Sequence, residues 1–145
     1  MGYAPALISL GLCYQKGSGT PVDEAKALSC YREAADQGEV SGYCHLGYCL
    51  LHGIGAPVDE VQAASLLQKA ADRKDAWAMG VLGDCYLQGR GVQKDRARAA
   101  ALYREAAQKG DSHAAKALKE LEGRAAPDRE KEKRSGGLFR RLFGK

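Results

Sequence analysis

Residues 82–91 read LGDCYLQGRG, and the same pattern stands at residues 10–19 (LGLCYQKGSG) and 46–55 (LGYCLLHGIG). The three copies lie 36 residues apart, and nine positions are identical in all of them without a gap. Those positions are the leucine, the cysteine and three glycines of this stretch, then one aspartate and three alanines further along. A fixed period of this length is typical of a repeat protein, in which each unit packs only on its neighbours.

Each copy is predicted to form two helices. In the third copy Ala78, Leu82 and Cys85 recur at helical spacing and would share one face. Gly89 follows them, and glycine suits the left-handed residue just beyond a helix end. Asp95 then stands where an N-cap side chain would accept the free backbone N–H groups of the second helix. The fold class is therefore predicted to be all-α.

Small residues are predicted to bring the two helices of a copy close together. We expect the glycine of each Leu-Gly pair to face a second helix that carries alanines, and four tyrosines to fill the spaces between layers: Tyr14, Tyr31, Tyr86 and Tyr103. Lys74 stands where the other copies end their second helix with glycine. We therefore expect the corner at residues 72–76 to be less well capped.

The run Leu-Gly-x-Cys-Tyr-x-x-Gly-x-Gly, followed by Asp, Ala and Tyr-x-x-Ala-Ala-x-x-Gly, resembles the Sel-1-like repeat family, relatives of the tetratricopeptide repeats. The resemblance covers residues 3–122, as copies at 3–38, 39–74 and 75–110 and a partial copy at 111–122. It implies a right-handed superhelical solenoid of helix-turn-helix repeats. Such solenoids scaffold protein complexes, typically without intrinsic catalysis and without a cofactor. Copy two departs from the pattern, with Leu50 and Leu67 where tyrosines are expected.

Five cysteines, an odd number, and an N-terminus without a basic leader predict reduced thiols in a cytoplasmic protein. Cysteine-rich members of the family pair cysteines between the two helices of each repeat. The second helices of copies two and three contain no cysteine, so a regular disulfide ladder is excluded. No stretch approaches the roughly 20 apolar residues that a membrane span needs.

The positive charge of the chain is concentrated at its C-terminus. Residues 123–145 carry eight Lys/Arg and three Asp/Glu, net +5, whereas residues 1–122 carry 14 and 15, net −1. A repeat region so close to neutrality gives little support to a nucleic-acid surface, which normally shows a basic stripe. We therefore expect another protein or a peptide as the partner, and no nucleic acid.

The predicted binding groove follows the first helices, which in this family line the concave side. Positions that differ among the copies, on one helical face, are its natural lining. Trp and Tyr are favoured binding anchors because they bury a large, rigid area and keep a polar tip. The predicted groove residues are two anchors, Tyr48 and Trp77, and four polar selectors, His45, His52, Asp84 and Gln88. The other interpretation of Trp77 is that it packs a seam between repeats.

A metal- or thiol-dependent sensor is a second alternative, because His45, Cys49 and His52 stand at i, i+4 and i+7. Imidazole and thiolate are suitable ligands for a soft divalent ion. Cys49, however, occupies the repeat position of Cys13 and Cys85, which marks it as a packing residue, so no metal site is predicted. No Ser-x-x-Lys motif or phosphate-binding loop is present either, and we expect no enzyme activity.

Residues 123–145 are predicted to form a flexible basic tail with a short amphipathic end. Its last apolar residues alternate with arginines: Leu138, Phe139, Arg140, Arg141, Leu142 and Phe143. Such a segment suits a partner's groove or an acidic membrane surface, although one short segment gives weak membrane affinity. A tail that only adds solubility is the third interpretation. Recruitment of the chain through this tail is therefore the first alternative function.

Solenoids need polar caps, because a terminal repeat otherwise exposes its stacking face. The first predicted helix begins almost at Met1, and Leu7 and Leu10 would lie close to an uncovered end. Two interpretations stay open. The sequence is a piece of a longer array, or this end self-associates or receives a partner helix.

Overall fold

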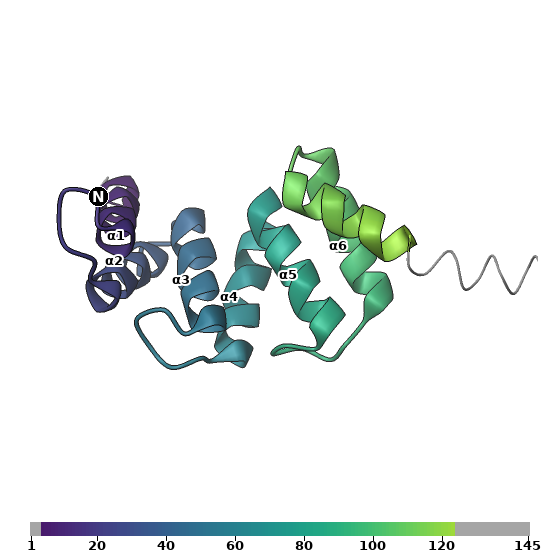
Figure 1. Ribbon diagram of the computed structural model, residues 1–145, viewed down its shortest axis with the longest axis horizontal. Helices are drawn as coiled ribbons and strands as arrows, with labels where there is room; N and C mark the ends of the chain where they lie inside the picture. The colour runs from purple at the N-terminus through teal and green to yellow at the C-terminus, as the bar shows by residue number, and fades with distance from the viewer. Residues whose placement is uncertain (1–3, 124–145) are drawn as a thin grey trace, which may run out of the picture.

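The computed structural model describes residues 4–123, and this part of the chain is a right-handed solenoid of helix pairs without strands (Figure 1). Six helices of 13 residues follow one another: α1 (Ala4–Lys16), α2 (Glu24–Asp36), α3 (Val40–His52), α4 (Glu60–Asp72), α5 (Ala76–Gln88) and α6 (Arg96–Gln108). Residues 112–123 are helical as well and lie against the last helix pair. The predicted basic tail lies outside the described residues.

The predicted helix ends are confirmed. Asp23, Asp59 and Asp95 each accept a hydrogen bond from the backbone N–H three residues on, at 3.0, 3.1 and 3.0 Å. Gly53 and Gly89 end α3 and α5 in the left-handed conformation, both with φ of 70°. The second helix of each copy therefore begins with the same local chemistry, whereas the first helices differ: Asp75 caps α5 with its side chain and Glu39 does not cap α3. Within residues 4–123, no helix is both long and apolar enough to cross a membrane.

The glycine of each Leu-Gly pair faces the alanine-bearing second helix, as expected, and the side chain that it meets there is a large one. A Cβ on Gly11 would stand 2.5 Å from Cε1 of Tyr31, and one on Gly83 would stand 2.7 Å from Cε1 of Tyr103. In copy two Leu67 replaces the ring. The two tyrosines are fully buried, and each also contacts the next first helix, Tyr31 at His45 and Tyr103 at His113. The missing Cβ accommodates an aromatic ring here, which a helical-wheel argument on one helix does not reveal.

The loop between the two helices of a repeat packs closely on the preceding repeat. The second loop glycines, Gly55 and Gly91, touch the backbone of Glu24 and Glu60 so closely that a Cβ would collide with it. Arg90 adds an ion pair with Glu60 and donates a hydrogen bond to the backbone carbonyl of Leu51 at 2.7 Å. These contacts fix how one helix pair stacks on the next.

The end of the array at copy one is uncovered, as predicted. The side chain of Leu10 is 45% exposed, whereas the equivalent Leu46 and Leu82 are 3% and 1% exposed. Gly19, which corresponds to Gly55, has nothing within 4 Å of its missing Cβ. Self-association through this end stays a prediction.

The corner at Lys74 keeps the left-handed turn of its glycine counterparts. Lys74 adopts a left-handed φ of 68°, and its N–H donates to the carbonyl of Ala71 at 2.8 Å. At the corresponding corner Gly38 has φ of 81°, and its N–H donates to Ala35 at 2.9 Å. The cap is nevertheless poorer, as expected: the N–H of Arg73 donates to the carbonyl of Ala70, whereas its counterpart Gln37 donates to the carbonyls of both Glu33 and Ala34. The backbone geometry dominates, and the cost appears as strain in a residue that has a Cβ.

Replacing Lys74 with glycine should stabilise the protein. The change relieves left-handed strain at the expense of chain entropy, for a net gain of about 0.5–1 kcal/mol in the free energy of unfolding. Loss of the exposed Lys74–Glu105 ion pair should matter little. Urea denaturation checks this, with Gly38→Lys as the reverse variant that should lose a similar amount. Equal midpoints for wild type and Lys74→Gly would contradict the strain argument.

Gly83→Ala should destabilise the protein despite alanine's better helix propensity. The new Cβ would overlap the Tyr103 ring, and overpacking of about 1–3 kcal/mol exceeds a helix-propensity gain of at most about 1 kcal/mol. We expect a net loss of about 1–2 kcal/mol in the same denaturation measurement. Ser65→Ala, on the exposed side of α4, is the control and should change little. A Gly83→Ala variant as stable as wild type would show that the ring moves freely.

Candidate partner-binding site

Five ring-bearing side chains form a continuous row across α2, α3 and α5. The ring centroids are 4.8 Å apart for Tyr31 and His45, 5.2 Å for His45 and Trp77, 5.4 Å for Trp77 and Tyr48, and 4.3 Å for Tyr48 and His52. We call these residues the aromatic row. Four of them are predicted groove residues, and the structure brings all four together.

The repeat geometry explains why these rings meet. His45, Tyr48 and His52 share one face of α3, at i, i+3 and i+7. Trp77 lies in the first turn of α5, whose N-cap Asp75 accepts a hydrogen bond from the N–H of Ala78 at 2.9 Å. Because α3 and α5 are first helices of adjacent copies, this turn brings Trp77 to both His45 and Tyr48.

The row is anchored at one end and open at the other. Tyr31 is fully buried, and its hydroxyl donates a hydrogen bond to Oε1 of Gln15 at 2.7 Å. His45, Tyr48 and Trp77 are half-buried, and His52 is exposed. Tyr31 was expected only as a packing residue. Its place in the row could not be read from the sequence, because it belongs to a second helix.

Burial lowers the pKa of His45 below its ordinary value, and the charge of Lys16 lowers it further while Asp75 raises it. The pKa of His52 is also lowered, by burial and by Arg90, with Asp84 acting in the opposite direction. Both imidazoles are therefore neutral at physiological pH. The row thus presents aromatic surface without a formal charge on its histidines.

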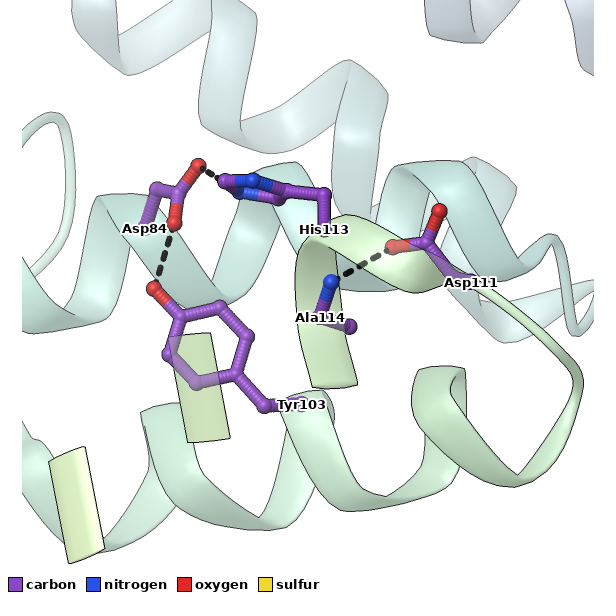
Figure 2. A network of polar contacts seen from close by, with 5 residues as sticks. All are labelled: Asp84, Tyr103, Asp111, His113 and Ala114. Atoms are coloured by element: carbon purple, nitrogen blue, oxygen red, sulfur yellow. Dashed lines mark hydrogen bonds and ion pairs between the residues drawn. The ribbon is translucent and has the colours of Figure 1, made fainter. Parts of the chain in front are cut away.

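Asp84 is engaged within the solenoid (Figure 2). One carboxylate oxygen accepts a hydrogen bond from the hydroxyl of Tyr103, and the other lies 2.9 Å from Nε2 of His113. Asp84 therefore ties α5 to α6 and to residues 112–123. Gln88, the remaining predicted selector, is exposed at the end of α5.

The cysteines lie mostly in the core of the solenoid. All five are free, and Cys30, Cys44, Cys49 and Cys85 are buried. Burial raises the pKa of the Cys49 and Cys85 thiols to about 11, so both stay protonated at neutral pH. Within residues 4–123, no three His, Cys, Asp or Glu side chains are grouped to hold a metal ion. Cys49 is a core residue here, whereas His45 and His52 belong to the aromatic row.

Two surface hollows lie away from the aromatic row. One lies between α2 and α4 and is lined by Arg32, Val58 and Val61 among others, with both valines exposed. The other lies on α6, around Leu102, Arg98 and Arg104. The sequence analysis missed both. The only sequence signal is a valine at an outward-facing helix position, and scattered exposed apolar residues are ordinary on protein surfaces.

Lowering the pH should destabilise the protein through His45. Its pKa is lower folded than unfolded, so its contribution to stability is complete above the unfolded value of about 6.5 and is lost as the pH falls toward the folded value. Unfolding free energies at pH 7.5 and 5.5 should show a smaller drop for His45→Phe, which keeps a ring in the stack. The same drop in wild type and in this variant would rule out His45 as the source.

Comparisons with known proteins agree with the architecture. The family model for the Sel1 repeat matches residues 4–39, 40–75 and 77–111. The structure of c5321, a protective antigen of uropathogenic Escherichia coli with an SLR fold, aligns with a TM-score of 0.79 and 32% identity over 86% of this chain and 27% of that one. A Sel1 repeat protein from Oxalobacter formigenes aligns with a TM-score of 0.71 and 37% identity, over 81% and 48% of the two chains.

Helicobacter pylori cysteine rich protein B shares the fold, with a TM-score of 0.65 and 23% identity over 80% of this chain and 90% of that one. No curated protein sequence matches the chain. The chain spans only 27% of c5321 and 48% of the Oxalobacter protein, so the likeness concerns the repeats and not the whole of either protein. The family model accounts for nearly all of the described residues, and the chain belongs to the Sel1 repeat family.

Proposed function

We propose that this chain is a non-catalytic scaffold that binds a protein or peptide over the aromatic row. Sel1 repeat proteins generally serve as scaffolds for protein–protein interaction. The observation that carries the proposal is the contact between Trp77 and Tyr48, two half-buried rings at 5.4 Å on adjacent repeats. A partner seated on them would touch two copies at once.

The size of the rings in the row and their packing on one another favour binding. Large aromatic residues dominate the energy of protein interfaces because they bury a wide area at little cost in side-chain entropy. Each ring of the row is held by its neighbours, so a ligand would meet a surface that is already ordered. We assign the polar edge of the site to His52, the exposed end of the row, and to Gln88, which is exposed at the end of α5.

Asp84 has a supporting role in this proposal. Its contacts with Tyr103 and His113 hold residues 112–123 beside α5, on the side of the row that faces the C-terminus. The face of the first helices, which the family resemblance predicts to be concave, would then run from α3 through α5 to residues 112–123. The ligand is an extended or helical segment with an apolar or aromatic anchor.

Selection from a peptide library on the purified protein tests the proposal. Peptides enriched on wild type should be lost on the Trp77→Ala/Tyr48→Ala variant. In titrations, Tyr48→Ala should weaken the binding of an enriched peptide at least about tenfold, as expected for an interface anchor. Trp77 is the only tryptophan of the chain, so its emission reports binding directly.

Tyr86→Ala is the matched control. Tyr86 lies on the same helix as Trp77, but its ring packs under Arg98 at 4.9 Å and takes no part in the row. We expect this variant to bind the enriched peptides like wild type. If Tyr48→Ala and Tyr86→Ala had equal effects, or if neither had one, the row would not be the binding surface.

A further inference from the structure

We infer that residues 138–143 of the same chain (LFRRLF) occupy the aromatic row and act as its built-in competitor. The inference rests on the proposed function, because it concerns the same surface. This segment lies outside the described residues, and 14 residues join it to the last of them.

The side chains of the segment match the row. Phe139 and Phe143 are the only phenylalanines of the chain, and Leu138 and Leu142 add apolar area at the same spacing. Phenylalanine pairs well with exposed Trp and Tyr, since offset or edge-to-face rings contribute about 0.5–1.5 kcal/mol beyond simple burial. The half-buried rings of Trp77 and Tyr48 offer such partners.

The charges match on the side of the row that faces the C-terminus. Tyr48, Asp84 and Glu120 occupy the same repeat position, so two acidic groups continue the line of Tyr48 along the first helices. Two basic side chains act on the row itself, Lys16 on His45 and Arg90 on His52, and each is opposed there by a carboxylate, Asp75 and Asp84 respectively. A segment that enters from the C-terminal side would place Arg140 and Arg141 near the carboxylates before its phenylalanines reach Trp77.

Residues 124–137, which join the segment to the described part of the chain, are long enough for it to reach the aromatic row. From residue 123 back to His113 the helix spans about 15 Å, and from Asp84 to Trp77 about 10 Å. His113 contacts Asp84 directly, which adds about 10 Å between helix axes, so the whole path is at most about 35 Å. Residues 124–137 can reach about 48 Å when extended. A tether of this kind gives a local concentration on the order of millimolar, so even a weak segment would occupy the row for much of the time.

Quenching of Trp77 fluorescence by acrylamide tests the contact in the full chain. We expect the quenching constant to rise about 1.5- to 2-fold in Phe139→Ser/Phe143→Ser, because the tethered segment no longer covers the indole. A synthetic peptide of residues 136–145, added at millimolar concentration to this variant, should lower the constant again. Lys131→Gln/Lys133→Gln removes two positive charges from the tether alone and should leave quenching unchanged.

Two outcomes would overturn the inference. One is equal quenching in wild type and in the phenylalanine variant, with the thermal unfolding midpoint of both unchanged. The other is protection of Trp77 that appears only as protein concentration rises, which would assign the segment to a second copy. Neither outcome bears on the library selection, which reports the row's affinity for other peptides. If both proposals hold, the phenylalanine variant should bind an enriched peptide more tightly than wild type.

Discussion

The structure depends on one contact that recurs in each copy, between a glycine on the first helix and a large side chain on the second. At Gly11 and Gly83 there is no space for a Cβ, because the rings of Tyr31 and Tyr103 lie there. The same rings then reach beyond their own repeat. Tyr31 stacks on His45, and Tyr103 meets His113 edge to face at 6.5 Å. The contact that closes a helix pair therefore also positions the next first helix, and in copy two it positions the start of the aromatic row.

The helices could be predicted because their signals are local. An aspartate accepting an N–H three residues on, or a glycine at a helix end, acts within one turn, so identical residues give identical ends. Which side chain Gly83 meets could not be predicted, because that depends on the distance and rotation between two helices. The left-handed backbone of Lys74 depends on the packing of two helices as well. Packing of α4 and α5 fixes the backbone there, and the residue adopts it at a cost in strain.

The residues of the candidate site were predicted because their positions differ among the three copies. Positions that repeat build the frame, so positions on the same helices that vary are available for a ligand. This reasoning found His45, Tyr48, His52 and Trp77, which lie together. It also selected Asp84, whose oxygens are taken up by Tyr103 and His113. A side chain at a variable position can bind a neighbouring side chain within the protein. The sequence alone does not distinguish such a side chain from one that is free to contact a ligand.

The aromatic row spans the junction between copies two and three, where the contacts that join the copies differ from those at the other junctions. Copy two has Leu67 in place of a tyrosine, so no ring of its second helix reaches toward copy three. Arg90 joins the two copies through Glu60 and the carbonyl of Leu51. Tyr48 and Trp77 stand on opposite sides of that junction. In a solenoid, stability is close to a sum of repeat and interface contributions, so a ligand that contacts both rings adds its binding energy to one interface. Occupancy of the row would thus couple directly to how firmly copies two and three are held together.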